Sequence, residues 1–141
     1  MSNFKAFMAG NAVRNEIVNY VASKRFVEDG EAIAWELHAI SSEKDEALRK
    51  ECTKKIPIAG KRGQSTKEVD TEKYIGKLCA ACITYPNLND AELQDSYQVK
   101  SAEELLKRML LPGEYADLQA KVMEINGYDM TIEDLVDEAK N

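Results

Sequence analysis

Apolar residues recur at the three- and four-residue spacing of amphipathic helices along the stretch from residue 88 to residue 126. Two pairs there place a side-chain acceptor three residues before a carboxylate, as at helix starts: Asn89 with Glu92, and Ser101 with Glu104. Pro112 ends one helix and can open the next, because its ring lacks an N–H and presets a helical φ. We therefore expect three consecutive helical segments, the last two forming a helical hairpin at about residues 102–125.

Residues 17–40 carry a second pattern, in which β-branched and aromatic residues come first and a strict alternation follows. Asp29-Gly30 between them is typical of a tight turn, because glycine accepts positive φ at little cost. The alternation turns Trp35 and Leu37 to the same side. This pattern predicts a β-hairpin with both residues facing inward, and helices must cover it because a lone hairpin is marginal in water.

Further helices are predicted at 43–55, capped by Ser42 with Asp45, at 71–85, and at 132–140 after a stop at Asn126-Gly127. Residues 57–70 hold two glycines, a proline and mixed charges without an apolar period, which predicts one long loop. Residues 1–15 predict a frayed terminus, although Phe4, Phe7 and Met8 are candidates for docking on the body or on a neighbour.

Together these segments predict an α+β fold that is mostly helical, with about five helices and an N-terminal β-hairpin packed on them. One additional short strand is compatible with the pattern. The 141 residues, of which 44% are hydrophobic and 31% charged, indicate a single globular domain over residues 1–141.

The net charge of −6 comes from the end of the chain. Residues 1–111 are balanced, whereas residues 112–141 carry two lysines against eight acidic residues. Such an end repels phosphates, so we expect no dedicated nucleic-acid binding. No apolar run approaches the roughly 20 residues of a membrane span. The start also lacks a secretory signal pattern, so we expect a cytosolic protein without a membrane partner.

The candidate chemistry is weak. Cys79 and Cys82 form a CxxC that Cys52 and His38 would nominally complete as a zinc set. However, the pair lies within a predicted helix on its apolar face, away from the helix start that lowers thiol pKa values in redox motifs. The three cysteines are therefore predicted to be reduced core residues, and His38 to lie on the outer face of a strand. No cofactor, metal or enzymatic activity is expected.

Two surfaces are candidates for binding a partner. The helical hairpin is more apolar than one core-facing stripe requires, and the residues in question are Leu105, Leu106, Met109, Leu110, Leu111 and Tyr115. For each of them alone, core packing is the simpler interpretation. The predicted loop carries Lys61 and Arg62, which are suited to an acidic partner segment, although a solvated loop is the simpler interpretation there.

Four strings in order give the chain a family resemblance: Ser23–Glu46 with WELHAISSEKDE, Cys52–Gln64 with CTKKIPIAGKRGQ, Tyr85–Tyr97 with YPNLNDAELQDSY, and LLPGEYADL with EINGYD between Leu110 and Asp129. The chain resembles the XkdN-like tail assembly chaperones of PBSX-type Bacillus prophage elements. The likeness covers nearly the whole length, with little signal in the first 15 or so residues. It assigns a function to no individual residue.

The resemblance implies a protein that binds the tape measure protein, keeps it soluble and helps to bring tail tube subunits to it. Such chaperones act in the host cytoplasm, leave before the tail is finished, and in related phages exist also as a longer frameshifted form. Self-association is a further expectation. Two alternatives remain open at this point, namely a structural tail connector or completion subunit that stays in the particle, and a thiol- or zinc-dependent enzyme.

Overall fold

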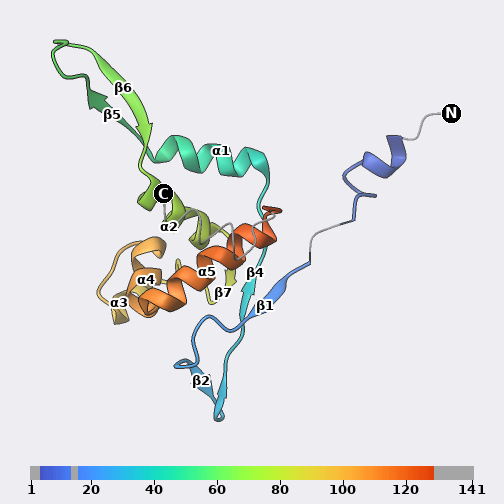
Figure 1. The fold of residues 1–141 in the computed structure, drawn as a ribbon. Helices are drawn as coiled ribbons and strands as arrows, with labels where there is room; N and C mark the ends of the chain where they lie inside the picture. The colour runs from blue at the N-terminus through green and yellow to red at the C-terminus, as the bar shows by residue number, and fades with distance from the viewer. Residues whose placement is uncertain (1–3, 14–15, 129–141) are drawn as a thin grey trace.

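The computed structural model describes residues 4–13 and 16–128 (Figure 1). The helices within these residues are η1 (Phe4–Phe7), α1 (Ser42–Glu51), α2 (Thr71–Ala81), α3 (Ala91–Ser96), α4 (Ala102–Met109) and α5 (Pro112–Ile125). The strands are β1 (Val18–Tyr20), β2 (Val27–Glu28), β3 (Glu31–Ala32), β4 (Trp35–Leu37), β5 (Thr53–Pro57), β6 (Ser65–Val69) and β7 (Ile83–Tyr85). The strands form three separate antiparallel sheets, ordered β1-β4-β7, β2-β3 and β5-β6.

The predicted N-terminal hairpin pairs as expected. Strand β1 runs antiparallel to β4 with Tyr20 opposite Trp35, and β2 and β3 continue the hairpin to its turn at Asp29 and Gly30. Both turn residues adopt positive φ, which explains the aspartate and glycine there. Trp35 and Leu37 face inward as predicted and are fully buried. Strand β7 adds a third strand on the other side of β4, which makes β4 the central strand.

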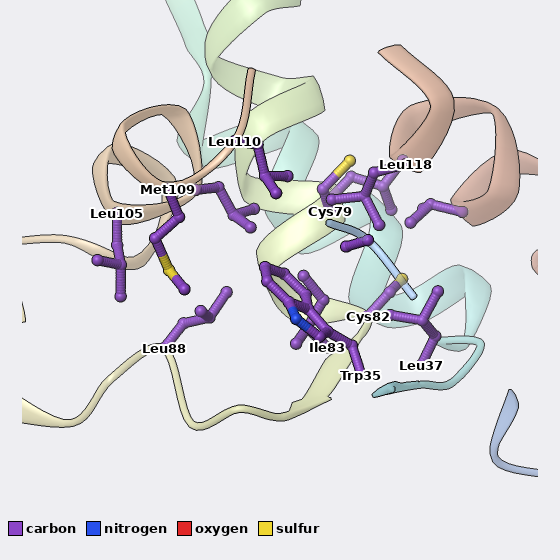
Figure 2. Close-up of a cluster of buried hydrophobic side chains, with 14 of the residues drawn as sticks. Trp35, Leu37, Cys79, Cys82, Ile83, Leu88, Leu105, Met109, Leu110 and Leu118 are labelled. Carbon is purple, nitrogen blue, oxygen red and sulfur yellow. The ribbon is translucent and has the colours of Figure 1, made fainter. Parts of the chain in front are cut away.

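The core lies between this sheet and the helices (Figure 2). Helix α2 is central, because it contacts α1, α4, α5 and β7. Its buried face meets Leu37 from β4, Leu105 from α4 and Leu118 from α5 in one continuous apolar cluster. Helix α1 is fixed to α2 by polar contacts: the Tyr74 hydroxyl donates to Asp45, and the Arg49 guanidinium stacks 4.6 Å from the Tyr74 ring centre.

The predicted mostly helical fold with a single hairpin at its N-terminus is wrong. The fold is α+β, but its strands are spread over three sheets, and one hairpin lies in the middle of the chain. Residues 57–70 were predicted as a loop, but they contain most of the β5–β6 hairpin. Five residue pairs face each other in this hairpin, from Thr53 opposite Val69 at its base to Pro57 opposite Ser65 near its tip. Gly60 and Gly63 both adopt positive φ in successive turns at the tip, so the glycines shape the end of a hairpin.

Several helix limits also differ from the predicted ones. Helix α1 ends at Glu51 and α2 at Ala81, because the residues that follow enter strands β5 and β7. Two caps lie one residue away from the predicted position: Ser41 accepts from the Lys44 N–H, and Asp90 accepts from the Leu93 N–H. The cap at Ser101 and the break at Pro112 are as predicted. The helix predicted at 132–140 lies outside the described residues.

Asn126 ties the end of α5 to the sheet. Its side-chain oxygen accepts from the Ile40 N–H at 3.0 Å, just after β4, while its amide nitrogen donates to the Val122 carbonyl at 2.8 Å. The same nitrogen lies 3.4 Å from the Cys82 sulfur. Gly127 follows with positive φ, which confirms the predicted helix stop.

Candidate protein-binding surfaces

The apolar residues predicted to bind a partner on the helical hairpin are divided between the core and the surface. Its first four members, Leu105, Leu106, Met109 and Leu110, are buried against α2 and the sheet. Leu111 lies in the connection between α4 and α5 and keeps 55% of its surface exposed. Leu110 has an extended backbone, which ends α4 and directs these two neighbouring leucines to opposite sides. Of the apolar face, Leu111 is therefore the side chain that offers a partner most of its surface.

Arg25 and Glu114 anchor this connection to the N-terminal hairpin. The Arg25 guanidinium, between β1 and β2, donates to the Met109 carbonyl and to Glu114 Oε1 at 3.0 Å. The same oxygen accepts from the Leu111 N–H at 2.8 Å. The hydrogen bond from Leu111, with those from Ser23 and Arg25, lowers the pKa of Glu114 to about 2. The backbone around Leu111 is thus fixed by hydrogen bonds at Met109, before it, and at Glu114, after it.

We expect Glu114→Gln to be less stable than the parent protein at pH 7, and the difference to narrow as the pH falls from about 4.5 towards 2. The reason is that the folded pKa lies below the ordinary value, so the carboxylate stabilises the fold above that ordinary value. The contribution is lost as the pH falls through the folded pKa. Urea unfolding at a series of pH values measures it.

Glu92→Gln is the matched control for Glu114→Gln, because Glu92 is an exposed carboxylate in the first turn of another helix, α3. The difference in free energy of unfolding between Glu92→Gln and the parent protein should change less over the same pH range. Equal pH dependence in the two variants would contradict the anchoring role of Glu114.

A groove of about 410 Å³ opens beside Tyr115, between α2, α4 and α5. It is lined by Thr71, Glu72, Ile75, Lys107, Tyr115 and Gln119. The Tyr115 hydroxyl is buried, and burial, followed by the neighbouring Cys79 and Glu103, raises its pKa to about 12. Gly76 allows the helices to approach here, because a Cβ at that position would lie 3.2 Å from the Glu103 Cβ.

The second predicted surface, with Lys61 and Arg62, lies at the exposed tip of the β5–β6 hairpin. Figure 1 shows this hairpin projecting from the body beyond α1. The structure does not bring Lys61 and Arg62 together with the α4–α5 connection. The two predicted surfaces are separate parts of the molecule.

The cysteines lie in the core as predicted, whereas His38, predicted on the outer face of a strand, lies one residue beyond its end. Cys52, Cys79 and Cys82 are buried free thiols in the core. Burial, and then the neighbouring Cys82, raises the pKa of Cys79 to about 12, which disfavours the reactive thiolate. His38 is partly exposed just after β4, with its Nδ1 2.6 Å from the Thr84 hydroxyl.

Sequence reasoning missed Arg25, whose partners lie more than eighty residues further along the chain. It also missed that Lys54, Lys55 and Lys67 lie on the strands of a β-hairpin. A usable signal was the pair of glycines, Gly60 and Gly63, with the β-branched residues Thr53 and Ile56 before them and Thr66 and Val69 after them. None of the helices within residues 4–13 and 16–128 combines the length and the hydropathy that a membrane span needs.

Comparison with known proteins gives a consistent answer over nearly the whole chain. Residues 4–140 match the family described as phage XkdN-like tail assembly chaperone protein. The chain is 36% identical to the uncharacterized protein YqbN of Bacillus subtilis strain 168, and 34% identical to the phage-like element PBSX protein XkdN of that strain. Each alignment covers 96% of this chain and 91% of the relative.

The crystal structure of YqbN superimposes with a TM-score of 0.77 at 28% identity, covering 92% of this chain and 99% of YqbN. The overall fold of this chain is therefore one that a solved relative shares. By its sequence, this chain belongs to the phage XkdN-like family of tail assembly chaperones.

Proposed function

We propose that this protein binds the tape measure protein of its phage or prophage element, keeps it soluble, and helps to recruit tail tube subunits to it. The observation that carries the proposal is the match to the chaperone family over residues 4–140. On this proposal the protein acts in the cytoplasm of the bacterial host and is absent from the finished particle.

We assign the client contact to the α4–α5 connection, centred on Leu111 and extending to Tyr115. An exposed leucine held by the hydrogen bonds of Glu114 and Arg25 is an ordered apolar contact point. It suits a client that exposes apolar stripes along its helices. Leu105, Leu106, Met109 and Leu110 support the connection from within, so a direct client contact by them would require α4 to leave the core. Lys61 and Arg62 form a separate polar surface.

Co-expression with the tape measure protein encoded in the same element tests the function. The expected result is that the tape measure protein becomes soluble and co-purifies with the chaperone. Leu111→Glu should weaken this co-purification without unfolding the chaperone, because Leu111 lies outside the core. Glu36→Lys, a charge change on the sheet, serves as the control and should co-purify like the parent protein.

An insoluble and unbound tape measure protein, in the presence of a folded chaperone, would overturn the proposal. Mass spectrometry of purified particles then decides the alternative role. Detection of the chain in finished tails would indicate a structural connector or completion subunit.

A further inference from the structure

The β5–β6 hairpin concentrates positive charge in an otherwise acidic chain. Residues 53–69 carry five Lys and Arg residues against one acidic residue, although the whole chain has a net charge of −6. Both strands are exposed along nearly their whole length. None of the ion pairs found among the described residues involves a side chain of this hairpin.

The two faces of the hairpin differ in how their charges are balanced. On one face Lys54 lies directly opposite Glu68, an opposite-charge pair that favours the hairpin. On the other face Lys55 lies directly opposite Lys67. Like charges directly opposite each other destabilise a hairpin. A partner that supplies carboxylates to this face would reduce the repulsion between the two lysines and so stabilise the hairpin. We call the face with Lys55 and Lys67 the basic face.

A matching acidic segment occurs at α3. Residues 86–99 contain Asp90, Glu92 and Asp95 and no Lys or Arg, and all three carboxylates are exposed. Some acidic side chains of the body are already paired within the chain, for example Glu103 with Lys77 and Glu114 with Arg25. None of the ion pairs among the described residues involves the α3 carboxylates.

The spacings on the two surfaces also agree. Side chains directly opposite in an antiparallel pair have Cβ atoms about 4.5–5.5 Å apart, which applies to Lys55 and Lys67. Side chains three residues apart on a helix, such as Glu92 and Asp95, have Cβ atoms about 5–6 Å apart. Two ammonium groups can therefore meet two carboxylates in register.

We infer that the basic face of the β5–β6 hairpin docks on α3 of a second copy of this chain. Within one molecule the hairpin projects away from the body at the end remote from α3, so the contact has to form between molecules (Figure 1). A second copy supplies the acidic surface that the basic face lacks. A nucleic acid would meet the repulsion of the acidic body. The contact joins two different surfaces, so it builds head-to-tail assemblies.

This inference concerns the chain alone and does not depend on the tape measure protein, so its test is independent of the proposed function. Sedimentation velocity of the full chain at about 50 mM salt should show self-association, which weakens at about 500 mM salt because exposed charges are screened. Lys55→Glu/Lys67→Glu should weaken the association by about tenfold or more. The control Lys24→Glu/Lys44→Glu makes the same change in net charge at exposed positions outside the hairpin and should associate like the parent protein.

Mixing two charge-reversed variants gives the sharpest test. Lys55→Glu/Lys67→Glu and Glu92→Lys/Asp95→Lys should each be monomeric alone, because like charges then face each other, and should associate when mixed. If Glu92→Lys disturbs the start of α3, Asp95→Lys alone replaces it, because a cation is favourable in the last turn of a helix. Circular dichroism checks that each variant is folded.

Three results would overturn the inference. The first is a parent protein that stays monomeric at low salt, and the second is a mixture of the two variants that stays monomeric. The third is a hairpin that binds a DNA oligonucleotide in place of a second copy, with binding lost in Lys55→Glu/Lys67→Glu.

Discussion

Replacing Leu106 with alanine is expected to lower the free energy of unfolding by about 2–5 kcal/mol, because a fully buried leucine loses its transfer free energy and leaves a cavity. Leu106 has no exposed surface and belongs to the apolar cluster that joins α4 to α2 and the sheet. The neighbouring elements are held by further contacts and can close only part of that cavity. Urea unfolding followed by circular dichroism measures the loss.

Leu111→Ala is the matched control for Leu106→Ala, since the same atoms are removed from an exposed leucine five positions further along. Its stability should stay within about 0.5 kcal/mol of the parent protein. Together the variants separate folding from binding. Leu106→Ala should chiefly lower the stability of the fold, whereas Leu111→Ala should chiefly weaken co-purification with the tape measure protein. Equal losses of stability would show that α4 is packed differently from the arrangement described here.

Replacing Trp35 with alanine is expected to cost about 3–5 kcal/mol, the range observed when buried aromatic side chains are removed from cores. Trp35 is 2% exposed on the central strand β4, lies opposite Tyr20 of β1, and has its ring centre 6.3 Å from that of Phe26. Its loss removes the contact surface that keeps the N-terminal hairpin on the helices. Because Trp35 is the only tryptophan, the variant is followed by far-ultraviolet circular dichroism.

Tyr85→Ala provides the comparison for Trp35→Ala. Tyr85 is also an aromatic residue of the same sheet, but it lies on the edge strand β7 and is 47% exposed. Its removal should cost clearly less than the removal of Trp35. If the two substitutions cost the same, the buried cluster around β4 would not be the main support of the sheet.

The sequence predicted those features that local patterns determine. The Ser101 cap, the break at Pro112 and the inward side of Trp35 all follow from neighbours within a few residues, and the structure has each of them. The three cysteines could be assigned to the core because the two predicted helices that carry them are amphipathic.

The misses have two physical causes. The β5–β6 hairpin buries neither face, so its strands lack the apolar alternation by which a strand is recognised. Strand β7 pairs with β4 over a separation of more than forty residues, which no local pattern shows. Without that pairing, residues 83–85 look like the last turn of the preceding helix.

The candidate surface was only partly predictable for a related reason. Periodicity predicts one apolar face on α4, with Leu105, Leu106, Met109 and Leu110. It does not indicate whether that face is covered by another helix or exposed to a partner. The answer depends on α2, which packs closely on α4 because Gly76 has no side chain. The exposure of Leu111 depends on the extended backbone at Leu110, where the helix ends.

The link between Asn126 and the strand region has a consequence for protein synthesis on the ribosome. Asn126 accepts from the Ile40 N–H, and Leu118 and Val122 of α5 are fully buried in the same apolar cluster as Leu37 and Cys82. A nascent chain that has not yet released α5 from the exit tunnel lacks this side of its core. Its early strands and α2 then present apolar surface until α5 emerges, so native packing is completed late in translation. Ribosome-bound chains that carry a C-terminal linker, short enough to keep α5 in the exit tunnel or long enough to release it, should therefore differ sharply in their resistance to protease.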